Sequence, residues 1–149
     1  GSAILKRMDK IRPFTKALSL LKEAKLRPTQ QRLALARLLL EGEHRHVTAE
    51  QLHGDALMAK IRVSLATVYN TLHQFTNAGL LREVVVEQGR SYFDTNTSDH
   101  HHFFNVDRGE LIDIPGDALT VGSLPPAPRG TNGSRVDIIV QVREANTRS

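Results

Sequence analysis

Apolar residues recur at a helical spacing along the first half of the chain and at a spacing of two further on. The helical spacing predicts four helices, over residues 13–23, 29–40, 48–56 and 65–75. After Gly79 the alternation predicts two strands joined by a turn, over residues 80–86, 87–90 and 91–94. Helix, turn, helix and then a two-stranded ribbon is the order of a winged helix-turn-helix.

Two of these helices carry clear start signals. The segment Thr48-Ala49-Glu50-Gln51 has the pattern of a capping box, in which the Thr48 hydroxyl accepts from the Gln51 amide and the Gln51 side chain reaches back. Ser64 is the predicted N-cap of the helix over residues 65–75. One side of that helix forms a predicted buried stripe at spacings of three and four: Leu65, Val68, Leu72 and Phe75.

The opposite face of the helix over residues 65–75 is polar but almost uncharged: it carries Thr67, Tyr69, Asn70, His73 and Gln74. A face in contact only with solvent normally carries Lys and Glu. Hydrogen-bonding and planar groups instead suit base edges and thymine methyl groups in a DNA major groove. We therefore expect Thr67, Tyr69, Asn70 and His73 to face DNA, although a plain surface position is the alternative for His73.

Four arginines near this helix are candidates for phosphate contacts. Arg27 and Arg32 flank the start of the second helix, and Arg82 and Arg90 lie on the predicted wing. Such contacts position a duplex without specifying its sequence. The charge distribution agrees, because residues 1–80 carry 13 Lys+Arg against 6 Asp+Glu (+7), and residues 81–149 carry 7 against 10 (−3). A basic half is typical of nucleic-acid binding, and a solvated basic surface is the alternative.

The pattern of residues 96–149 predicts a second unit, built mainly from strands. A hairpin is expected over residues 102–106 and 110–114, and a last strand over 135–143, while the Pro-rich segment 124–128 cannot hold a long helix. Three strands make a marginal domain alone, so we expect a homodimer. The predicted fold class is α+β, with a winged-helix DNA-binding domain over residues 1–95 and a small α/β dimerisation domain with a three-stranded sheet over 96–149.

A histidine cluster is the strongest chemical feature of the second unit. In Asp99-His100-His101-His102, alternation along a strand places His100 and His102 on one side and His101 elsewhere. Asp94 and Asp113 lie nearby in the sequence, and His46 precedes the third helix. Mixed imidazole and carboxylate ligands suit Fe(II), Mn(II) or Zn(II). The alternatives are an exposed polar turn or the remains of a purification tag.

Other classes of protein fit poorly. The chain has no cysteine, which excludes disulfides, thiol catalysis and zinc sites built from CxxC pairs. No apolar run approaches the roughly 20 residues that span a bilayer, and the start of the chain is too charged for a secretory signal. We therefore expect a cytoplasmic protein without a membrane partner. A metal-dependent hydrolase is disfavoured because no separate general base or phosphate-binding glycine loop is visible, so we expect no enzyme.

Several motifs together resemble the ferric uptake regulator family: Arg27-Pro28-Thr29-Gln30-Gln31-Arg32, His46-Val47-Thr48-Ala49-Glu50, Leu65-Ala66-Thr67-Val68-Tyr69-Asn70-Thr71-Leu72 and Asp99-His100-His101-His102. The resemblance implies that Tyr69 and Asn70 read bases in an inverted-repeat operator and that Arg27 and Arg32 contact its backbone. It also implies a regulatory metal site between the domains, with five competent ligands: His46, Asp94, His100, His102 and Asp113.

Two departures from the family pattern refine the resemblance. The paired CxxC zinc site of most members is impossible here, and no histidine follows His102. These features resemble the iron response regulator branch of alphaproteobacteria, which implies a repressor whose DNA binding is weakened by haem at His100, His101 and His102. With no Cys-Pro motif, haem binding must use histidine. A metal or peroxide sensor with Mn(II) or Fe(II) as corepressor is the alternative.

Overall fold

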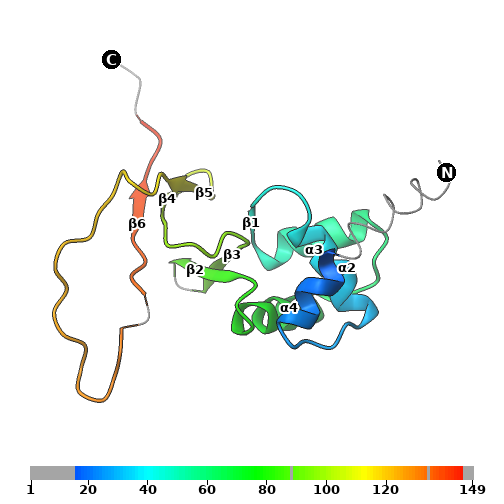
Figure 1. The fold of residues 1–149 in the computed structure, drawn as a ribbon. Helices are drawn as coiled ribbons and strands as arrows, with labels where there is room; N and C mark the ends of the chain where they lie inside the picture. The colour runs from blue at the N-terminus through cyan, green and yellow to red at the C-terminus, as the bar shows by residue number, and fades with distance from the viewer. Residues whose placement is uncertain (1–15, 88, 134, 146–149) are drawn as a thin grey trace, which may run out of the picture. The chain divides into compact units, whose positions relative to one another are not determined.

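The chain divides into two compact units, Gly1–Thr97 and Ser98–Ser149. The structure is a computed structural model, which describes residues 16–87, 89–133 and 135–145. The start of the first predicted helix, residues 13–15, lies outside the described residues. The N-terminal unit contains helices and a small sheet, whereas the described part of the second unit contains three strands and no helix (Figure 1). The sequence predicts a small α/β domain for this unit, and its described residues form the strands of that prediction without a helix.

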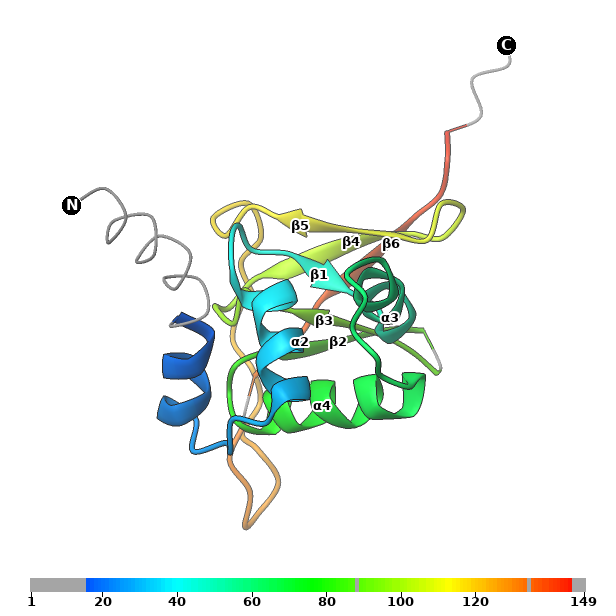
Figure 2. The same ribbon diagram turned by 90° about the vertical axis from the view of Figure 1, so that its right-hand side faces the viewer.

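Four helices build the described part of the first unit in the predicted order: residues 16–23, α2 (Gln30–Leu40), α3 (Ala49–Met58) and α4 (Leu65–Asn77). The predicted start signals are confirmed. Thr48 and Gln51 form both hydrogen bonds of a capping box, and Ser64 Oγ accepts from the backbone amide of Thr67 at 3.1 Å. In Figure 2, α4 crosses beneath α2, with α3 beside both helices.

The helices enclose one apolar core. Leu35 of α2, Leu52 of α3 and the predicted stripe of α4 are buried there, except that Leu65 is only half-buried. Val68, Leu72 and Phe75 have no exposed surface. Burying a side chain of this size stabilises the fold by about 1.5–3 kcal/mol relative to leaving it in water. This packing fixes which face of α4 points outward.

A three-stranded sheet follows the helices, with strand order β1-β3-β2. Its predicted strands are β2 (Arg82–Glu87) and β3 (Arg90–Asp94), and the turn between them has Gly89 at a φ of 74°, where a residue with a Cβ is strained. The third strand is the unpredicted β1 (His46–Val47), which pairs antiparallel with β3 so that His46 lies opposite Asp94.

The second unit also holds a three-stranded sheet, with order β5-β4-β6. The hairpin of β4 (His101–Asn105) and β5 (Glu110–Ile114) confirms the predicted one to within a residue. The last strand, β6 (Ile139–Val142), is shorter than the predicted residues 135–143 and runs parallel to β4. The described residues between β5 and β6, 115–133 and 135–138, form no helix or strand and are coloured yellow to orange in Figure 1.

The two faces of this second sheet differ in chemistry. Phe103, Ile112 and Val140 are aligned across its three strands and therefore lie on one face, where Ile112 and Val140 are 46% and 37% exposed. The opposite face carries His102 of β4 and its cross-strand partner Asp113 of β5. One face is thus an incompletely covered apolar row, and the other holds the histidine cluster.

Candidate metal centre and candidate nucleic-acid interface

The polar face of α4 lies opposite its buried stripe. Tyr69, Asn70 and His73 are exposed on this face, and Thr67 is half-buried. The Thr67 hydroxyl accepts a hydrogen bond from Ser64 Oγ at 2.9 Å, so Thr67 also takes part in the helix cap. The face therefore presents the planar and hydrogen-bonding groups that can read base edges.

Tyr69 is held at both ends. Its hydroxyl donates to Glu50 Oε1 at 2.8 Å, and its ring stacks on His73, with 6.5 Å between ring centroids. His73 in turn contacts the ring of buried Phe93 edge-on at 5.5 Å. The hydrogen bond to Glu50, with smaller effects of burial and of the Glu50 charge, raises the pKa of Tyr69 above its ordinary value of 10.0. Tyr69 remains 38% exposed, so it is both oriented and accessible.

Arg32 connects the start of α2 with α4. Its Nη1 donates to the Arg27 carbonyl at 2.9 Å, and its Nε donates to Gln74 Oε1 at 3.1 Å. Arg32 is half-buried and Arg27 is exposed. A guanidinium that is already oriented loses less entropy when it meets a phosphate. Arg32 therefore lies beside the polar face of α4, and its side chain also binds the backbone of Arg27.

The two arginines of the predicted wing differ in exposure. Arg90 is exposed and forms an ion pair with Glu87 at 3.9 Å, which leaves its surface open to a phosphate. Arg82 is only 3% exposed, so its assignment as a phosphate contact is corrected. The physical reason is strand alternation, which places Arg82 on the same face of β2 as the buried Val84 and Val86.

The histidine cluster of the second unit is arranged as a candidate metal centre. His102 Nε2 lies 3.2 Å from Asp113 Oδ1, and His100 Nε2 lies 3.7 Å from the same oxygen. The two imidazole rings are tilted, with centroids 4.5 Å apart. His100 and His102 are buried, at 7% and 1% exposed, whereas the Asp113 side chain is half-exposed. The strand alternation and the cross-strand pairing together bring these three ligands to one point.

The hydrogen bonds of the histidines decide which nitrogen can bind a metal. His100 Nδ1 lies 2.7 Å from the Ser98 carbonyl, which can only accept, so Nδ1 carries a proton and the ring would bind a metal through Nε2. A carbonyl that accepts from the nitrogen opposite the metal in this way orients many metal-binding histidines. The hydrogen bond of His101 selects the other tautomer. Its Nδ1 accepts from the Ile138 amide at 3.0 Å, so its Nε2 carries the proton.

The other two predicted ligands lie in the N-terminal unit. His46 of β1 and Asp94 of β3 are register partners in the wing sheet. Asp94 is buried, and its Oδ1 accepts from the Asn96 amide at 2.9 Å; His46 is half-buried and meets the Tyr92 ring edge-on at 5.9 Å. The structure thus divides the five ligands into two groups, two in one unit and three in the other.

The three ligands of the second unit fit a divalent transition-metal ion. Ligand atoms bonded at about 2.1 Å and separated by a tetrahedral angle lie about 3.4 Å apart. The 3.2 and 3.7 Å separations at Asp113 Oδ1 bracket this value, and all three ligand atoms lie within 4.8 Å of one another. Two neutral imidazoles and one carboxylate suit Mn(II), Fe(II) and Zn(II).

Sequence reasoning missed two residues that orient these groups. Glu50 holds the Tyr69 hydroxyl, and the Ser98 carbonyl selects the tautomer of His100. For Glu50 the only signal was its place in the capping-box segment, where Thr48 and Gln51 have the capping roles. For Ser98 no side-chain signal existed, because the group involved is a backbone carbonyl.

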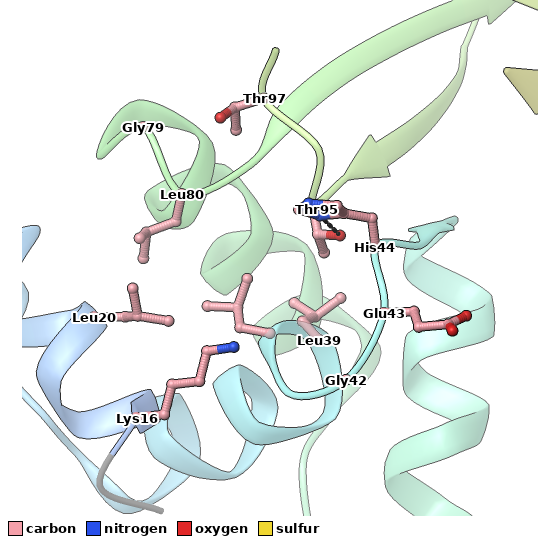
Figure 3. A pocket seen from close by; sticks show the side chains of 11 residues that line it. Lys16, Leu20, Leu39, Gly42, Glu43, His44, Gly79, Leu80, Thr95 and Thr97 are labelled. Atoms are coloured by element: carbon pink, nitrogen blue, oxygen red, sulfur yellow. Dashed lines mark hydrogen bonds between the residues drawn. The ribbon is translucent and has the colours of Figure 1, made fainter. Parts of the chain in front are cut away.

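A pocket of about 370 Å³ lies in the N-terminal unit, apart from the polar face of α4. Part of its lining is apolar, with Leu20, Leu39 and Leu80 turned inward, and the Lys16 side chain extends toward these leucines (Figure 3). At its rim, His44 Nδ1 lies 3.4 Å from Thr95 Oγ1. These residues belong to neither candidate site.

Known proteins resemble the chain over most of its length. A sequence model of the ferric uptake regulator family matches residues 23–123. The ferric uptake regulation protein of Vibrio cholerae is 36% identical over 100 residues, which are 66% of this chain and 67% of that protein. The counterpart in Escherichia coli is 35% identical over 100 residues, which are 66% of this chain and 68% of that protein.

Solved structures agree with these sequence matches. The ferric uptake regulator of Pseudomonas aeruginosa with manganese is 27% identical, with a TM-score of 0.65, and the similarity covers 87% of this chain and 98% of that one. The Vibrio cholerae ferric uptake regulator gives the same identity and TM-score over 84% of this chain and 97% of that one.

The family match includes α4 and the strands β4 and β5 that carry the histidine cluster. Among the residues that the structure describes, no helix is long and apolar enough to cross a membrane. The chain belongs to the ferric uptake regulator family.

Proposed function

We propose that the chain is a homodimeric transcription regulator that binds an inverted-repeat DNA operator through α4 and responds to a divalent cation at His100, His102 and Asp113. The observation that carries this proposal is the convergence of three ligand side chains on one point. His102 Nε2 and His100 Nε2 lie 3.2 and 3.7 Å from the same Asp113 oxygen, and the ligand atoms lie within 4.8 Å of one another. Burying two imidazoles beside one carboxylate costs free energy unless these groups are paired, so an ordinary polar turn would not be expected to contain them.

Three ligands leave a divalent ion with open positions, and we propose that His46 and Asp94 complete the set. These two are already paired across β1 and β3, so the N-terminal unit offers them together. An ion bound by ligands from both units holds one arrangement of the units better than others. It thereby changes the DNA affinity of the dimer, because a ligand shifts an equilibrium by its differential affinity for the two states.

The DNA-binding part of the proposal rests on the exposed face of α4 and on the arginines around it. Tyr69, Asn70 and His73 supply groups for base edges, and Arg32 is hydrogen-bonded to the same helix through Gln74. Arg27 and Arg90 are exposed and supply positive charge for phosphates. Thr67 adds a hydroxyl and a methyl group at the edge of this face, next to the helix cap.

The homodimer is supported by the apolar row of the second sheet. Phe103, Ile112 and Val140 cross all three strands, and Ile112 and Val140 keep 46% and 37% of their surface exposed. A two-fold contact between such rows buries apolar surface on both copies. It also provides the two reading heads that an inverted repeat requires.

A haem-responsive repressor, as in the iron response regulator branch, is the second candidate. The half-buried His101 and Phe103 lie on one face of β4 and provide an imidazole next to an aromatic ring. However, His101 Nδ1 accepts from the Ile138 amide, so binding iron through Nε2 requires the ring to lose that hydrogen bond. The two imidazoles and the carboxylate of His100, His102 and Asp113 favour a small divalent cation over haem.

The test is the binding of operator DNA by the full chain at fixed salt concentration. Duplexes selected from a random pool are titrated in fluorescence anisotropy with metal-chelated, Mn(II)-loaded and haem-loaded protein. We expect Mn(II) to change the affinity by at least about fivefold, the lower end of typical coupling between sites. His102→Ala should abolish this change.

The matched control is His53→Ala, which removes an imidazole that contacts the Val63 carbonyl in the N-terminal unit. This variant should keep the Mn(II) response. A response to haem alone, accompanied by a shift of the haem absorbance, establishes the second candidate in place of the first. If no duplex is enriched by any form of the protein, the proposed regulator function is wrong.

A further inference from the structure

An acidic side chain lies beside the residues proposed to read DNA. Glu50 is exposed on α3, and its Oε1 accepts the hydroxyl proton of Tyr69 on α4 at 2.8 Å. A carboxylate next to a duplex repels the phosphates and lowers affinity for every sequence alike. Such a charge is useful in a DNA-binding surface only where it discriminates between sequences.

The position of Glu50 does not have a simpler structural explanation in the helix cap. Thr48 and Gln51 form the capping box of α3, and both hydrogen bonds of the box are made without Glu50. A carboxylate in the first turn interacts favourably with the helix dipole, which is worth only about 0.3–1 kcal/mol at an exposed site. The directed contact of Glu50 is the hydrogen bond to Tyr69.

This hydrogen bond determines what Tyr69 can offer to a base. A phenol hydroxyl normally donates one hydrogen bond and also accepts. When its hydrogen is committed to Glu50, the oxygen of Tyr69 presents lone pairs only, and the carboxylate beside it presents lone pairs only. The pair is therefore a local surface of acceptors, at the point where Tyr69 is 38% exposed.

The major groove offers two matching donors. The exocyclic amino groups of adenine N6 and cytosine N4 donate hydrogen bonds, whereas guanine O6 and thymine O4 accept them. An acceptor-only surface gains from the amino groups and is repelled by the carbonyl oxygens. The raised pKa of Tyr69 agrees, because the hydrogen bond to Glu50 keeps the phenol protonated and oriented.

We propose that Glu50 is a specificity-determining residue, which fixes the Tyr69 hydroxyl as an acceptor and thereby selects an adenine or cytosine amino group against guanine and thymine. The proposal rests on the proposed DNA-binding function. His73 supports it by stacking on the Tyr69 ring from one side, while the buried Phe93 supports His73. The phenol is thus fixed both at its hydroxyl and along its ring.

The experiment selects duplexes from a random pool with wild-type protein, Glu50→Gln and the matched control Glu23→Gln. The control removes an exposed carboxylate from the helix over residues 16–23 of the same unit. Wild-type protein and the control should prefer adenine or cytosine at one position of each half-site by on the order of tenfold. Glu50→Gln keeps the shape but adds an amide donor, so this preference should fall to near parity at that position alone.

A second variant gives a change of sign. In Glu50→Ala the Tyr69 hydroxyl is free to donate, so guanine or thymine should be gained at the same position. In Tyr69→Phe the hydroxyl is absent, so the preference should be weakened whether residue 50 is Glu, Gln or Ala. If Glu50→Ala and Glu50→Gln keep the wild-type base profile while binding DNA, the inference is overturned and the proposed function stands.

A spectroscopic arm tests the hydrogen bond without DNA. The chain has two tyrosines and no tryptophan, so the tyrosinate absorbance of Tyr69 is obtained as the difference between wild type and Tyr69→Phe. Its titration should move to lower pH in Glu50→Gln and stay in place in Glu23→Gln. An unmoved titration overturns the inference. If no protein enriches any duplex although the titration moves, the proposed function fails, and the inference fails with it.

Discussion

Lys60 offers a sharp test of the local energetics beside α4. It follows the last turn of α3 with a φ of 59°, in the left-handed region. The conformation is imposed by two hydrogen bonds, from the Ile61 amide to the Ala56 carbonyl at 2.8 Å and from the Lys60 amide to the Leu57 carbonyl at 3.1 Å. This pair of bonds is the Schellman motif, whose left-handed position is usually glycine.

The expected effect of Lys60→Gly follows from two opposing terms. A residue with a Cβ pays about 1–2 kcal/mol in the left-handed region. Glycine avoids that cost but loses about 0.5–1 kcal/mol more backbone entropy on folding. The free energy of unfolding should therefore rise by about 0.5–1 kcal/mol. Lys60→Ala keeps the Cβ and should change it by less than about 0.5 kcal/mol, as for an ordinary surface substitution.

The assay is thermal unfolding of the full chain, followed by circular dichroism at fixed protein concentration without metal. A gain of 0.5–1 kcal/mol corresponds to a rise in Tm of about 1–4 °C for a chain of this size. The glycine variant should melt above both wild type and the alanine variant. Equal melting of the two variants, or a lower Tm for glycine, would refute the reasoning.

Three further predictions concern the helix cap, the metal centre and the phosphate contacts. Thr48→Ala removes the side-chain acceptor of the capping box and should lower the free energy of unfolding by about 1 kcal/mol in urea denaturation. Thr131→Ala removes an exposed hydroxyl that donates to the Pro128 carbonyl between β5 and β6, and it should have a smaller effect. Asp113→Asn should weaken Mn(II) binding at least about tenfold in calorimetry, and unchanged affinity would exclude Asp113 as a ligand. Arg90→Ala should weaken binding to all duplexes alike and should reduce by about one the slope of the logarithm of DNA affinity against the logarithm of salt concentration. Replacing the buried Arg82 by Ala should give no such uniform loss of DNA affinity.

The parts of the fold that depend on local chemistry could be predicted from the sequence. The capping box at Thr48, the N-cap at Ser64 and the buried stripe of α4 depend on residues within one or two helical turns. All are confirmed, except that Leu65 of the stripe is only half-buried. The α+β class is confirmed as well. The family consists of transcription regulators, which confirms the expectation that the chain is not an enzyme.

Features that depend on contacts between distant segments could not be predicted. The strand β1 has only two residues, and its identity comes from pairing with β3 rather than from its own pattern. Glu50 and Tyr69 are 19 residues apart, so only the packing of α3 on α4 shows that they meet. The position of Arg82 on the wing predicts a phosphate contact, although the alternation of β2 places this residue with the buried valines.

The candidate metal centre was partly predictable, because part of its arrangement depends on the local alternation of side chains along a strand. Alternation at the start of β4 puts His102, and His100 just before the strand, on the side of Asp113, and it puts His101 on the other side, as the sequence indicated. The sequence could not show that the Ser98 carbonyl selects one tautomer of His100 or that the Ile138 amide selects the other for His101. The parallel pairing of β6 that brings Ile138 there has no local signal.

The central claim is that cation binding at His100, His102 and Asp113 is coupled to DNA binding. The most direct test is the Mn(II) affinity of the full chain, measured with and without a saturating selected duplex. Linkage requires the duplex to change the Mn(II) affinity by the same factor by which Mn(II) changes the duplex affinity. The account predicts a matching change of at least about fivefold in both titrations. An Mn(II) affinity that is the same with and without DNA would contradict it.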